Sequence, residues 1–251
     1  MDLGLHHGTW LVTGGTSGLG FASAAAIVAE GGGALVVGRD PVRAEAAVAR
    51  LGGDSVAVTA DLADPRCAGR IVAAAQARST PLRGAVLSVG GPPAGTVLST
   101  PDDAWRRSFE AVFLGPVRLA RSLAQDCPDL ESLVWVLSSS AKSPIAGLSI
   151  SNGLRPGLAM LVKDLADELG SRGIRVNALL PGRFDTPRVR ELEDASGDPA
   201  GARARVAAAI PLGRYGDPEE FGVTAAFLLS PRASYITGTV VAIDGGAART
   251  L

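Results

Sequence analysis

The sequence predicts an α/β fold: a single domain, residues 1–251, built on a seven-stranded parallel sheet with helices on both faces. Short apolar runs alternate with longer Ala-, Arg- and Glu-rich stretches of helical period. The apolar runs lack strict alternation of apolar and polar residues, which is typical of strands covered on both faces. Strand–helix alternation with crossovers of this length favours a doubly wound sheet, and 251 residues suffice for one such unit with a large core.

We expect seven strands, in chain order at residues 9–13, 34–38, 55–60, 84–89, 132–137, 174–180 and 239–243. Four of the intervening helices are predicted to begin where a capping side chain precedes a proline, at Asp40-Pro41, Asp64-Pro65, Thr100-Pro101 and Asp217-Pro218. An acidic residue three positions later extends two of these caps to capping boxes, Thr100 with Asp103 and Asp217 with Glu220.

Residues 185–209 lack strand character and are polar at first, then rich in Ala and Arg. The segment follows the sixth expected strand, and ligands bind beyond the carboxyl ends of strands in sheets of this kind. We therefore interpret it either as a lid-like segment on the substrate side or as an ordinary pair of surface helices.

Composition excludes several classes of function. Lys and Arg number 24 against 25 Asp and Glu, and this net charge of −1 provides no general attraction to nucleic acid or to a membrane surface. No apolar run reaches the roughly 18 residues of a spanning helix. Asp2 and the absence of a basic stretch at the N-terminus argue against a signal peptide. Cys67 and Cys127 lack metal-ligand spacing, so we expect reduced thiols, a cytoplasmic location and no metal site.

A glycine-rich loop follows the first expected strand and precedes a helical run from Phe21; it reads Thr13-Gly14-Gly15-Thr16-Ser17-Gly18-Leu19-Gly20. Glycines here allow a tight turn and a close approach of the backbone to a pyrophosphate at a helix N-terminus. A turn that merely joins a strand to a helix is the alternative. The preceding strand, the following helix and a second strand ending at Gly38 favour the dinucleotide-binding unit of a Rossmann fold.

The pattern Thr-Gly-x-x-x-Gly-x-Gly resembles the short-chain dehydrogenase/reductase family, and the resemblance covers nearly the whole chain. Asp61-Leu62 is similar to the family's adenine contact, and Asn177, Pro181-Gly182 and Thr186 are similar to its nicotinamide-side segment. Residues 211–220, 235–238 and 244–246 resemble its C-terminal signature. The cofactor-binding residues that we expect are Gly14, Thr16, Ser17, Gly18, Leu19, Gly20, Arg39, Asp61, Leu62, Gly90, Pro181, Gly182 and Thr186. The resemblance also implies a homotetramer or homodimer, formed through the helices beginning near Thr100 and Ser151 and the last strand.

The end of the second strand indicates which dinucleotide binds. An acidic residue there would bond the ribose 2′-hydroxyl of NAD, but Gly38 occupies that position. Arg39 follows, and a guanidinium can hold a 2′-phosphate through paired hydrogen bonds. Asp40 is better explained as a helix cap. We therefore predict NADP(H) as the cofactor, with a solvated surface arginine as the alternative for Arg39.

The catalytic pattern of the family is altered. In the family an Asn, a Ser and a Tyr-x-x-x-Lys pair form the active site. Counting back from residues 172–174 places Ser151 and Arg155 at the Tyr and Lys positions. Ser138 matches the family serine, with Ser139 as an alternative, and Val112 stands at the Asn position. The resemblance therefore implies a divergent member without the usual phenol and amine that handle the proton.

This change has chemical consequences. A phenol has a pKa of about 10, whereas a serine hydroxyl offers no accessible acid of this kind. Arginine cannot release a proton. Arg155 can hold an anion or stabilise a developing alkoxide, and Ser151 lies four residues earlier on the same helix face. Lys142 is the candidate proton donor. The alternatives are that Ser151 or Asn152 caps the helix, that Arg155 forms an internal salt bridge, and that Lys142 is solvated.

The predicted function is an NADP(H)-dependent oxidoreductase of the short-chain dehydrogenase/reductase type, similar to a 3-oxoacyl reductase, acting on a small carbonyl or alcohol substrate at a non-standard site. Ser138 and Ser151 would hydrogen-bond the carbonyl oxygen, Arg155 would stabilise charge, and water or Lys142 would supply the proton. One alternative is a non-redox lyase, isomerase or cyclase whose arginine holds a carboxylate or enolate. The other is a catalytically silent NADP(H)-binding protein.

Overall fold

The computed structural model describes residues 2–194 and 197–249. Seven parallel strands form one sheet in the order β3-β2-β1-β4-β5-β6-β7. Their bounds are β1 Thr9–Thr13, β2 Gly33–Gly38, β3 Ser55–Thr59, β4 Leu82–Leu87, β5 Ser132–Val136, β6 Arg175–Pro181 and β7 Val240–Ile243. The predicted doubly wound Rossmann sheet is thus confirmed.

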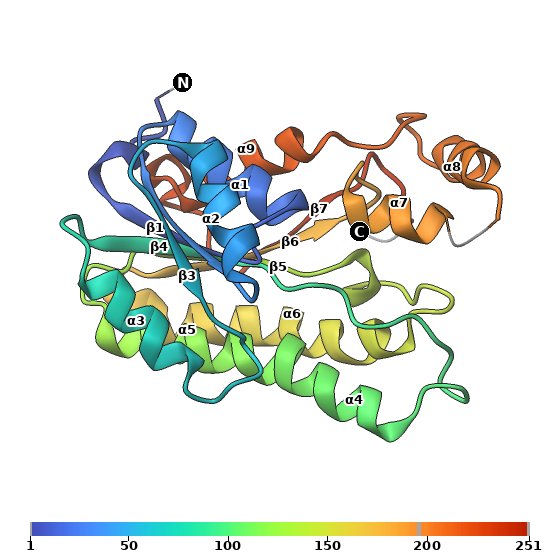
Figure 1. The fold of residues 1–251 in the computed structure, drawn as a ribbon, viewed down its shortest axis with the longest axis horizontal. Coiled ribbons are helices and arrows are strands. Elements are labelled where there is room, and N and C mark those ends of the chain that lie inside the picture. Colours follow the sequence, from blue (N-terminus) through green and yellow to red (C-terminus); the bar gives the residue numbers. More distant parts are fainter. Residues whose placement is uncertain (1, 195–196, 250–251) are drawn as a thin grey trace.

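Helices cover both faces of the sheet (Figure 1). One layer consists of α1 (Gly18–Ala29), α2 (Pro41–Leu51) and α9 (Pro218–Leu229), and the opposite layer of α3 (Cys67–Gln76), α4 (Asp102–Ser108), α5 (Gly115–Asp126) and α6 (Ser149–Leu169). Trp10 and Val12 of β1 belong to the core under the first layer, whereas Leu11 between them belongs to the core under the second. Because successive side chains of a strand point to opposite faces, burial on both faces produces the continuous apolar runs in the sequence.

The largest error in the predicted strands concerns β4, which was expected at residues 84–89 and ends at Leu87. The strand begins earlier because Leu82 already pairs with Thr9 across a register shift. Ser88 and Val89 leave the ladder and line a cavity instead. The other predicted strands match within one residue at each end.

Two of the four predicted helix caps form. The Asp40 carboxylate accepts the N–H groups of Val42 and Arg43 at the start of α2, and the Glu220 carboxylate accepts the Asp217 N–H at the start of α9.

The other two caps were wrong. Asp64 accepts the Arg66 N–H and closes a separate turn, so α3 begins only at Cys67. The Thr100 hydroxyl donates to the Thr96 carbonyl at 2.7 Å, so no capping box forms with Asp103 and α4 begins at Asp102.

The segment 185–209 forms two helices, α7 (Pro187–Asp194) and α8 (Pro199–Ala208), which follow β6 and lie at one end of the molecule (Figure 1). Its interpretation as a lid stays a prediction. Within the described ranges, no helix combines the length and the apolar character that a membrane crossing requires.

Candidate functional site

A cavity of about 440 Å³ lies at the carboxyl ends of β1, β2, β3 and β4. The strand order reverses at β1: β2 and β3 lie on one side of it, and β4 to β7 lie on the other. Ligands bind at such a switch point in open α/β sheets. The Thr13 hydroxyl donates to the Ser88 carbonyl at 2.7 Å and joins β1 to the segment after β4 there. Of the predicted cofactor residues, those that line the cavity are Gly14, Thr16, Ser17, Arg39, Asp61, Leu62 and Gly90.

Gly14, Thr16 and Ser17 of the glycine loop line the cavity. Gly14 and Gly18 have φ values of 58° and 54°, a left-handed conformation that favours glycine. A Cβ on Gly20 would lie 2.3 Å from the Gly14 carbonyl oxygen, so α1 can contact the loop only because this position is a glycine. Gly18, Leu19 and Gly20 therefore form the first turn of α1 behind the loop instead of lining the cavity.

Two arginines border the cavity at the β2 end. Arg39 lies there as predicted, and Arg43, four residues later on α2, joins it. Neither guanidinium forms an ion pair within the part of the chain that the structure describes. A Cβ on Gly38 would lie 2.5 Å from Thr16 Cγ2, which explains why a larger residue does not fit here unless Thr16 moves. This end of the cavity is thus positively charged and lacks the acidic residue expected for NAD.

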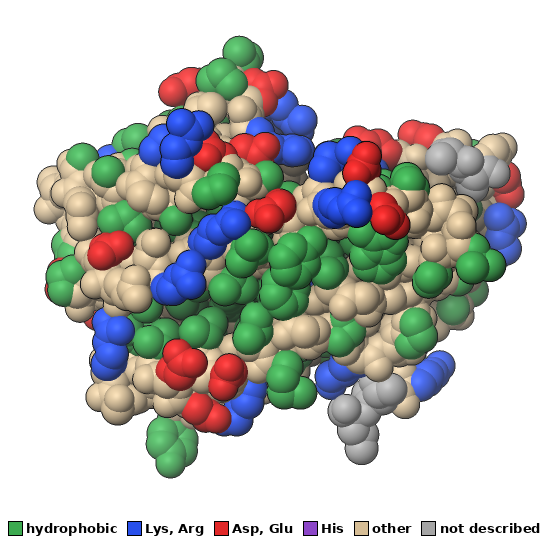
Figure 2. Space-filling model, turned by 90° about the horizontal axis from the view of Figure 1, so that it is seen from below, with side chains coloured by type: hydrophobic (Ala, Val, Ile, Leu, Met, Phe, Trp, Pro, Cys, Tyr) green, Lys and Arg blue, Asp and Glu red, His purple; other side chains and the backbone are tan. Residues whose placement is uncertain are grey.

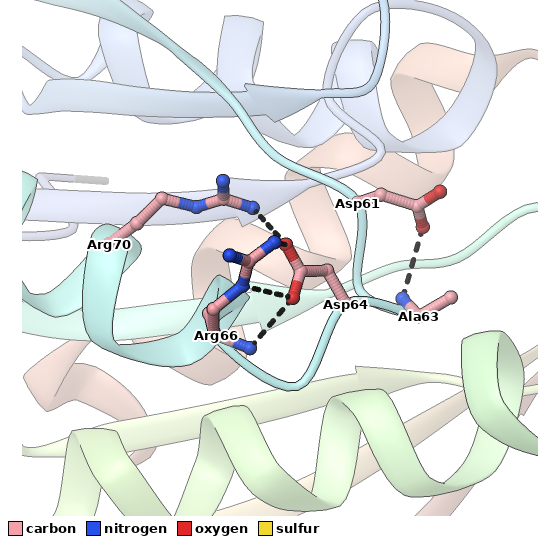
Figure 3. A network of polar contacts seen from close by, with 5 residues as sticks. All are labelled: Asp61, Ala63, Asp64, Arg66 and Arg70. Carbon is pink, nitrogen blue, oxygen red and sulfur yellow. Dashed lines mark hydrogen bonds and ion pairs between the residues drawn. The ribbon is translucent and has the colours of Figure 1, made fainter.

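Asp61 lines the cavity on the loop after β3 (Figure 3). One of its carboxylate oxygens accepts the Ala63 N–H at 3.0 Å, and no basic residue pairs with it among the described residues. The neighbouring Asp64 binds Arg66 and Arg70 instead, at 3.2 and 2.9 Å. Hydrogen bonds from Arg66 lower the pKa of Asp64. Asp64 thus attracts the local guanidinium groups, and the Asp61 carboxylate stays available to a ligand.

The wall opposite the glycine loop carries Val112, within a π-helical turn at Phe109–Leu114. Val112 is buried and lines the cavity, so an apolar residue lies at the position that the sequence resemblance assigns to the family's Asn. Arg107 on α4 also lines this wall.

The predicted nicotinamide-side residues, Pro181, Gly182 and Thr186, do not line the cavity. Gly182 follows β6, and its N–H donates to the Ile243 carbonyl at 2.9 Å. Thr186 is buried, and a Cβ on Gly18 would lie 3.6 Å from its Cγ2 atom. Gly182 is thus joined to the end of β7, and Thr186 lies near the start of α1.

The serines after β5 contact α6 in an arrangement that the sequence did not predict. Ser138 and Ser139 are half-buried, and the Ser138 hydroxyl accepts the Ser140 N–H at 3.1 Å. The buried hydroxyls of Ser140 and Ser151 lie 2.9 Å apart. Ser140 is thus the serine that contacts Ser151.

Neither predicted cap forms at the start of α6. The helix already begins at Ser149, so Ser151 lies within its first turn. The Asn152 amide bonds both the N–H and the carbonyl of Ile145 and anchors the preceding loop.

Arg155 is 4 % exposed on α6. One Nη atom donates to the Val136 carbonyl at 2.9 Å, while Nε has no hydrogen-bond partner among the described residues. Burial lowers the pKa of the guanidinium to about 10. No salt bridge to Arg155 forms within the described ranges, so it is a buried positive charge bound to one carbonyl at the end of β5.

Lys142 is exposed on the loop after β5 and makes no polar side-chain contact with the described residues. None of Ser138, Lys142, Ser151 and Arg155 lines the cavity. The described residues contain no group of three or more His, Cys, Asp or Glu side chains that could hold a metal ion.

Sequence reasoning missed Arg43, Arg107 and Ser140. Arg43 lies in the first turn of α2, which the Asp40-Pro41 cap predicts, so its place near Arg39 could have been found. Ser140 belongs to a 3-10 turn, Ser139–Ala141, and no sequence signal distinguishes it from its serine neighbours.

Comparison with known proteins agrees with this geometry. A family model described as enoyl-(acyl carrier protein) reductase matches residues 14–248. A cis-4-hydroxycyclohexanecarboxylate dehydrogenase from Sinomonas cyclohexanicum is 33% identical over 94% of this chain and 94% of its own length. A protein from Xanthobacter autotrophicus named inactive 2-(S)-hydroxypropyl-CoM dehydrogenase 2 is 31% identical over 89% of this chain and 98% of its own length.

Solved structures match over the whole fold. L-sorbose reductase from Gluconobacter frateurii, solved with NADPH and L-sorbose, has a TM-score of 0.93 and 28% identity, covering 100% of both chains. An NADPH-bound short chain oxidoreductase from Pseudomonas aeruginosa PAO1, described as containing an atypical catalytic center, has a TM-score of 0.90 and 27% identity, covering 98% of this chain and 99% of that one. The chain belongs to the short-chain dehydrogenase/reductase family, a family of oxidoreductases.

Proposed function

We propose that the protein is an NADP(H)-dependent oxidoreductase that interconverts a small carbonyl compound and its alcohol, similar to a 3-oxoacyl reductase. The observation that carries this proposal is the cavity between the glycine loop and two arginines without carboxylate partners. NADPH is also the cofactor in the L-sorbose reductase and Pseudomonas aeruginosa structures.

The residues present fit a phosphorylated dinucleotide. The left-handed Gly14 and Gly18 and the N-terminus of α1 suit a pyrophosphate. Arg39 and Arg43 suit a 2′-phosphate, because a guanidinium binds phosphate oxygens through paired hydrogen bonds. Asp61 offers a carboxylate to the adenine. When bound, the nicotinamide would donate or accept the hydride.

The protein's own part in the reaction is to hold the substrate oxygen and manage its charge. We propose that the half-buried Ser138 hydroxyl, which accepts the Ser140 N–H, donates a hydrogen bond to that oxygen. Arg155 supplies a permanent positive charge, which favours a developing alkoxide in a poorly solvated site. Ser151 holds Ser140 and so fixes the turn that carries Ser138. We propose that water or Lys142 supplies the proton. Loss of a positioned acid costs about 10²–10⁴ in rate, so we expect slow turnover.

Binding titrations test the cofactor assignment. We expect the wild-type protein to bind NADPH more tightly than NADH, and we expect Arg39→Ala or Arg43→Ala to weaken NADPH binding about tenfold or more while leaving NADH unchanged. Arg121→Ala is the matched control, since Arg121 is exposed on α5 outside the cavity. Equal affinity for the two dinucleotides, or an unchanged preference in both variants, would refute the assignment.

A silent NADP(H)-binding protein is the second candidate. The four predicted catalytic residues lie outside the cavity lining, and one relative is named as inactive, which favours this candidate. Product analysis with a panel of carbonyl compounds separates the two functions, because oxidation of NADPH requires turnover. Product formation without any change in the absorbance of the reduced nicotinamide would instead indicate the non-redox alternative.

We further propose that the chain assembles as a homodimer or homotetramer through the layer that contains α4, α5 and α6. Figure 2 shows apolar side chains extending across this face, and Phe109 and Met160 are 41% and 71% exposed on its helices. Light scattering at micromolar concentration should report more than one chain, and a monomer would overturn this proposal. The cytoplasmic location stays a prediction; Cys67 and Cys127 are both buried free thiols.

A further inference from the structure

Asp185 connects two helices that follow β6. One of its carboxylate oxygens accepts a hydrogen bond from Arg190 Nε at 2.9 Å and from Arg203 Nη1 at 3.2 Å. Arg190 lies on α7 and Arg203 on α8. The hydrogen bonds from Arg190 and Arg203 lower the pKa of Asp185 to about 2, so the carboxylate is ionised at any working pH.

Arg203 contacts more than this carboxylate. Its guanidinium carbon lies 4.5 Å from the centre of the Tyr215 ring, within cation–π range. It also lies 3.6 Å from Glu193 Oε2 on α7. Tyr215 is buried, and the adjacent Gly216 exchanges backbone hydrogen bonds with the segment that contains Asp185, at 2.9 and 3.0 Å. One side chain of α8 therefore contacts the segment after β6, α7 and the Tyr215 segment.

The residue after Asp185 lies near the start of α1. Thr186 is 7% exposed, and a Cβ on Gly18 would lie 3.6 Å from its Cγ2 atom. Thr186 also accepts the N–H groups of Val189 and Arg190 on its backbone carbonyl and so begins α7. Hydrogen bonds thus connect α8 through Asp185 to the start of α7, and the Thr186 side chain there lies near Gly18, where α1 begins.

We propose that Arg203 is a positioning residue for dinucleotide binding: through Asp185 it holds Thr186 against Gly18 and couples α8 to the cofactor cavity. This inference rests on the proposed NADP(H) function. Coupling between sites is reciprocal, so a bound dinucleotide must strengthen the attachment of α8 by the same factor by which α8 strengthens binding.

The first experiment compares two arginines of the same helix. Arg203→Gln removes the contact to Asp185, whereas Arg205→Gln removes a guanidinium that is 70% exposed and pairs with Asp198 at 3.3 Å. We expect NADPH affinity, measured by equilibrium fluorescence titration, to fall about tenfold in Arg203→Gln and to change less than about twofold in Arg205→Gln. Arg203→Lys should recover most of the affinity, because it restores a charge opposite Asp185. A purely structural role would lower the urea midpoint equally in the glutamine and lysine variants.

Two further measurements complete the test. Asp185→Asn should weaken NADPH binding to the same degree as Arg203→Gln, and the double variant should be no weaker than either single variant. NADPH should slow limited proteolysis within residues 187–208 of the wild-type protein but not of Arg203→Gln. Equal NADPH affinity in wild type and Arg203→Gln would overturn this inference alone. Failure of the wild-type protein to bind NADPH would overturn the proposed function and the inference together.

Discussion

Replacing Arg155 by Met should stabilise the protein while it removes a charge from the site. Burial lowers the pKa of this guanidinium from 12.5 to about 10, and at about 1.4 kcal/mol for each pKa unit this corresponds to roughly 3 kcal/mol of unfavourable burial at neutral pH. The variant loses the hydrogen bond to the Val136 carbonyl, which costs about 1 kcal/mol. Methionine adapts to irregular apolar space. The free energy of unfolding should therefore rise by about 2 kcal/mol, consistent with the effect of replacing buried charges by apolar residues.

Urea unfolding measures this change without cofactor and at one fixed protein concentration, because assembly contributes to apparent stability. Arg175→Met is the matched control. Arg175 is also buried, but its guanidinium donates to the carbonyls of Leu228, Leu229 and Ser230 at the end of α9. Its removal breaks three hydrogen bonds from a charged group and leaves the Leu229 carbonyl without a donor among the described residues, whereas Leu228 and Ser230 keep the Ser132 hydroxyl and the Ala233 N–H, so it should destabilise the protein by about 2 kcal/mol or more. A loss of stability above about 1 kcal/mol in Arg155→Met would refute the reasoning, because it would mean that Arg155 is held for structural reasons.

Three further predictions concern the loop, cofactor preference and a thiol. Gly20→Ala places a Cβ about 2.3 Å from the Gly14 carbonyl oxygen, so α1 must shift and NADPH affinity should fall about tenfold or more by titration calorimetry; unchanged affinity would contradict the close approach. Gly38→Asp should weaken NADPH binding about tenfold or more relative to NADH, because a carboxylate repels the 2′-phosphate; an unchanged ratio of the two affinities would contradict it. Burial raises the pKa of Cys67 from 9.0 to about 11, so its thiolate should be about 100-fold scarcer than in the unfolded chain at pH 8 and react about 100-fold more slowly with a thiol reagent; similar rates in folded and urea-unfolded protein would exclude this.

The sheet could be predicted from the sequence because its central strands are buried on both faces and read as apolar runs, although the edge strands β3 and β7 are only partly buried. The end of β4 was predicted two residues too late. Ser88 and Val89 follow the apolar residues of β4 in the sequence but leave the ladder at the cavity, so the expected strand extends beyond the observed pairing. Capping was predictable only where the side chain has no nearer competitor. The Thr100 hydroxyl donates to the Thr96 carbonyl and therefore does not cap α4.

Many of the residues that line the cavity could also be predicted, because glycines between a strand and a helix indicate a tight turn at that point. The positions of Gly14, Thr16 and Arg39 at the cavity agree with that prediction. The contacts of Ser140 and Arg203 could not be predicted, because each depends on the direction of a side chain relative to a different element of the fold. Ser140 meets Ser151 across eleven positions, and Arg203 meets Asp185 across eighteen.

The sequence resemblance assigns Ser151 and Arg155 to the positions of the family's Tyr and Lys, and these two differences are physically related. In the family the cation serves a phenol, whose pKa it lowers toward neutrality. A serine hydroxyl titrates far too high for that, and here Ser151 already has a partner in Ser140. Arg155 thus has no acid to tune, and its Nε lacks a partner among the described residues. A buried donor of this kind is costly unless an oxygen atom reaches it. The Val136 carbonyl is bonded through Nη1, so no described residue offsets the cost at Nε, and this cost agrees with the gain in stability that we expect for Arg155→Met.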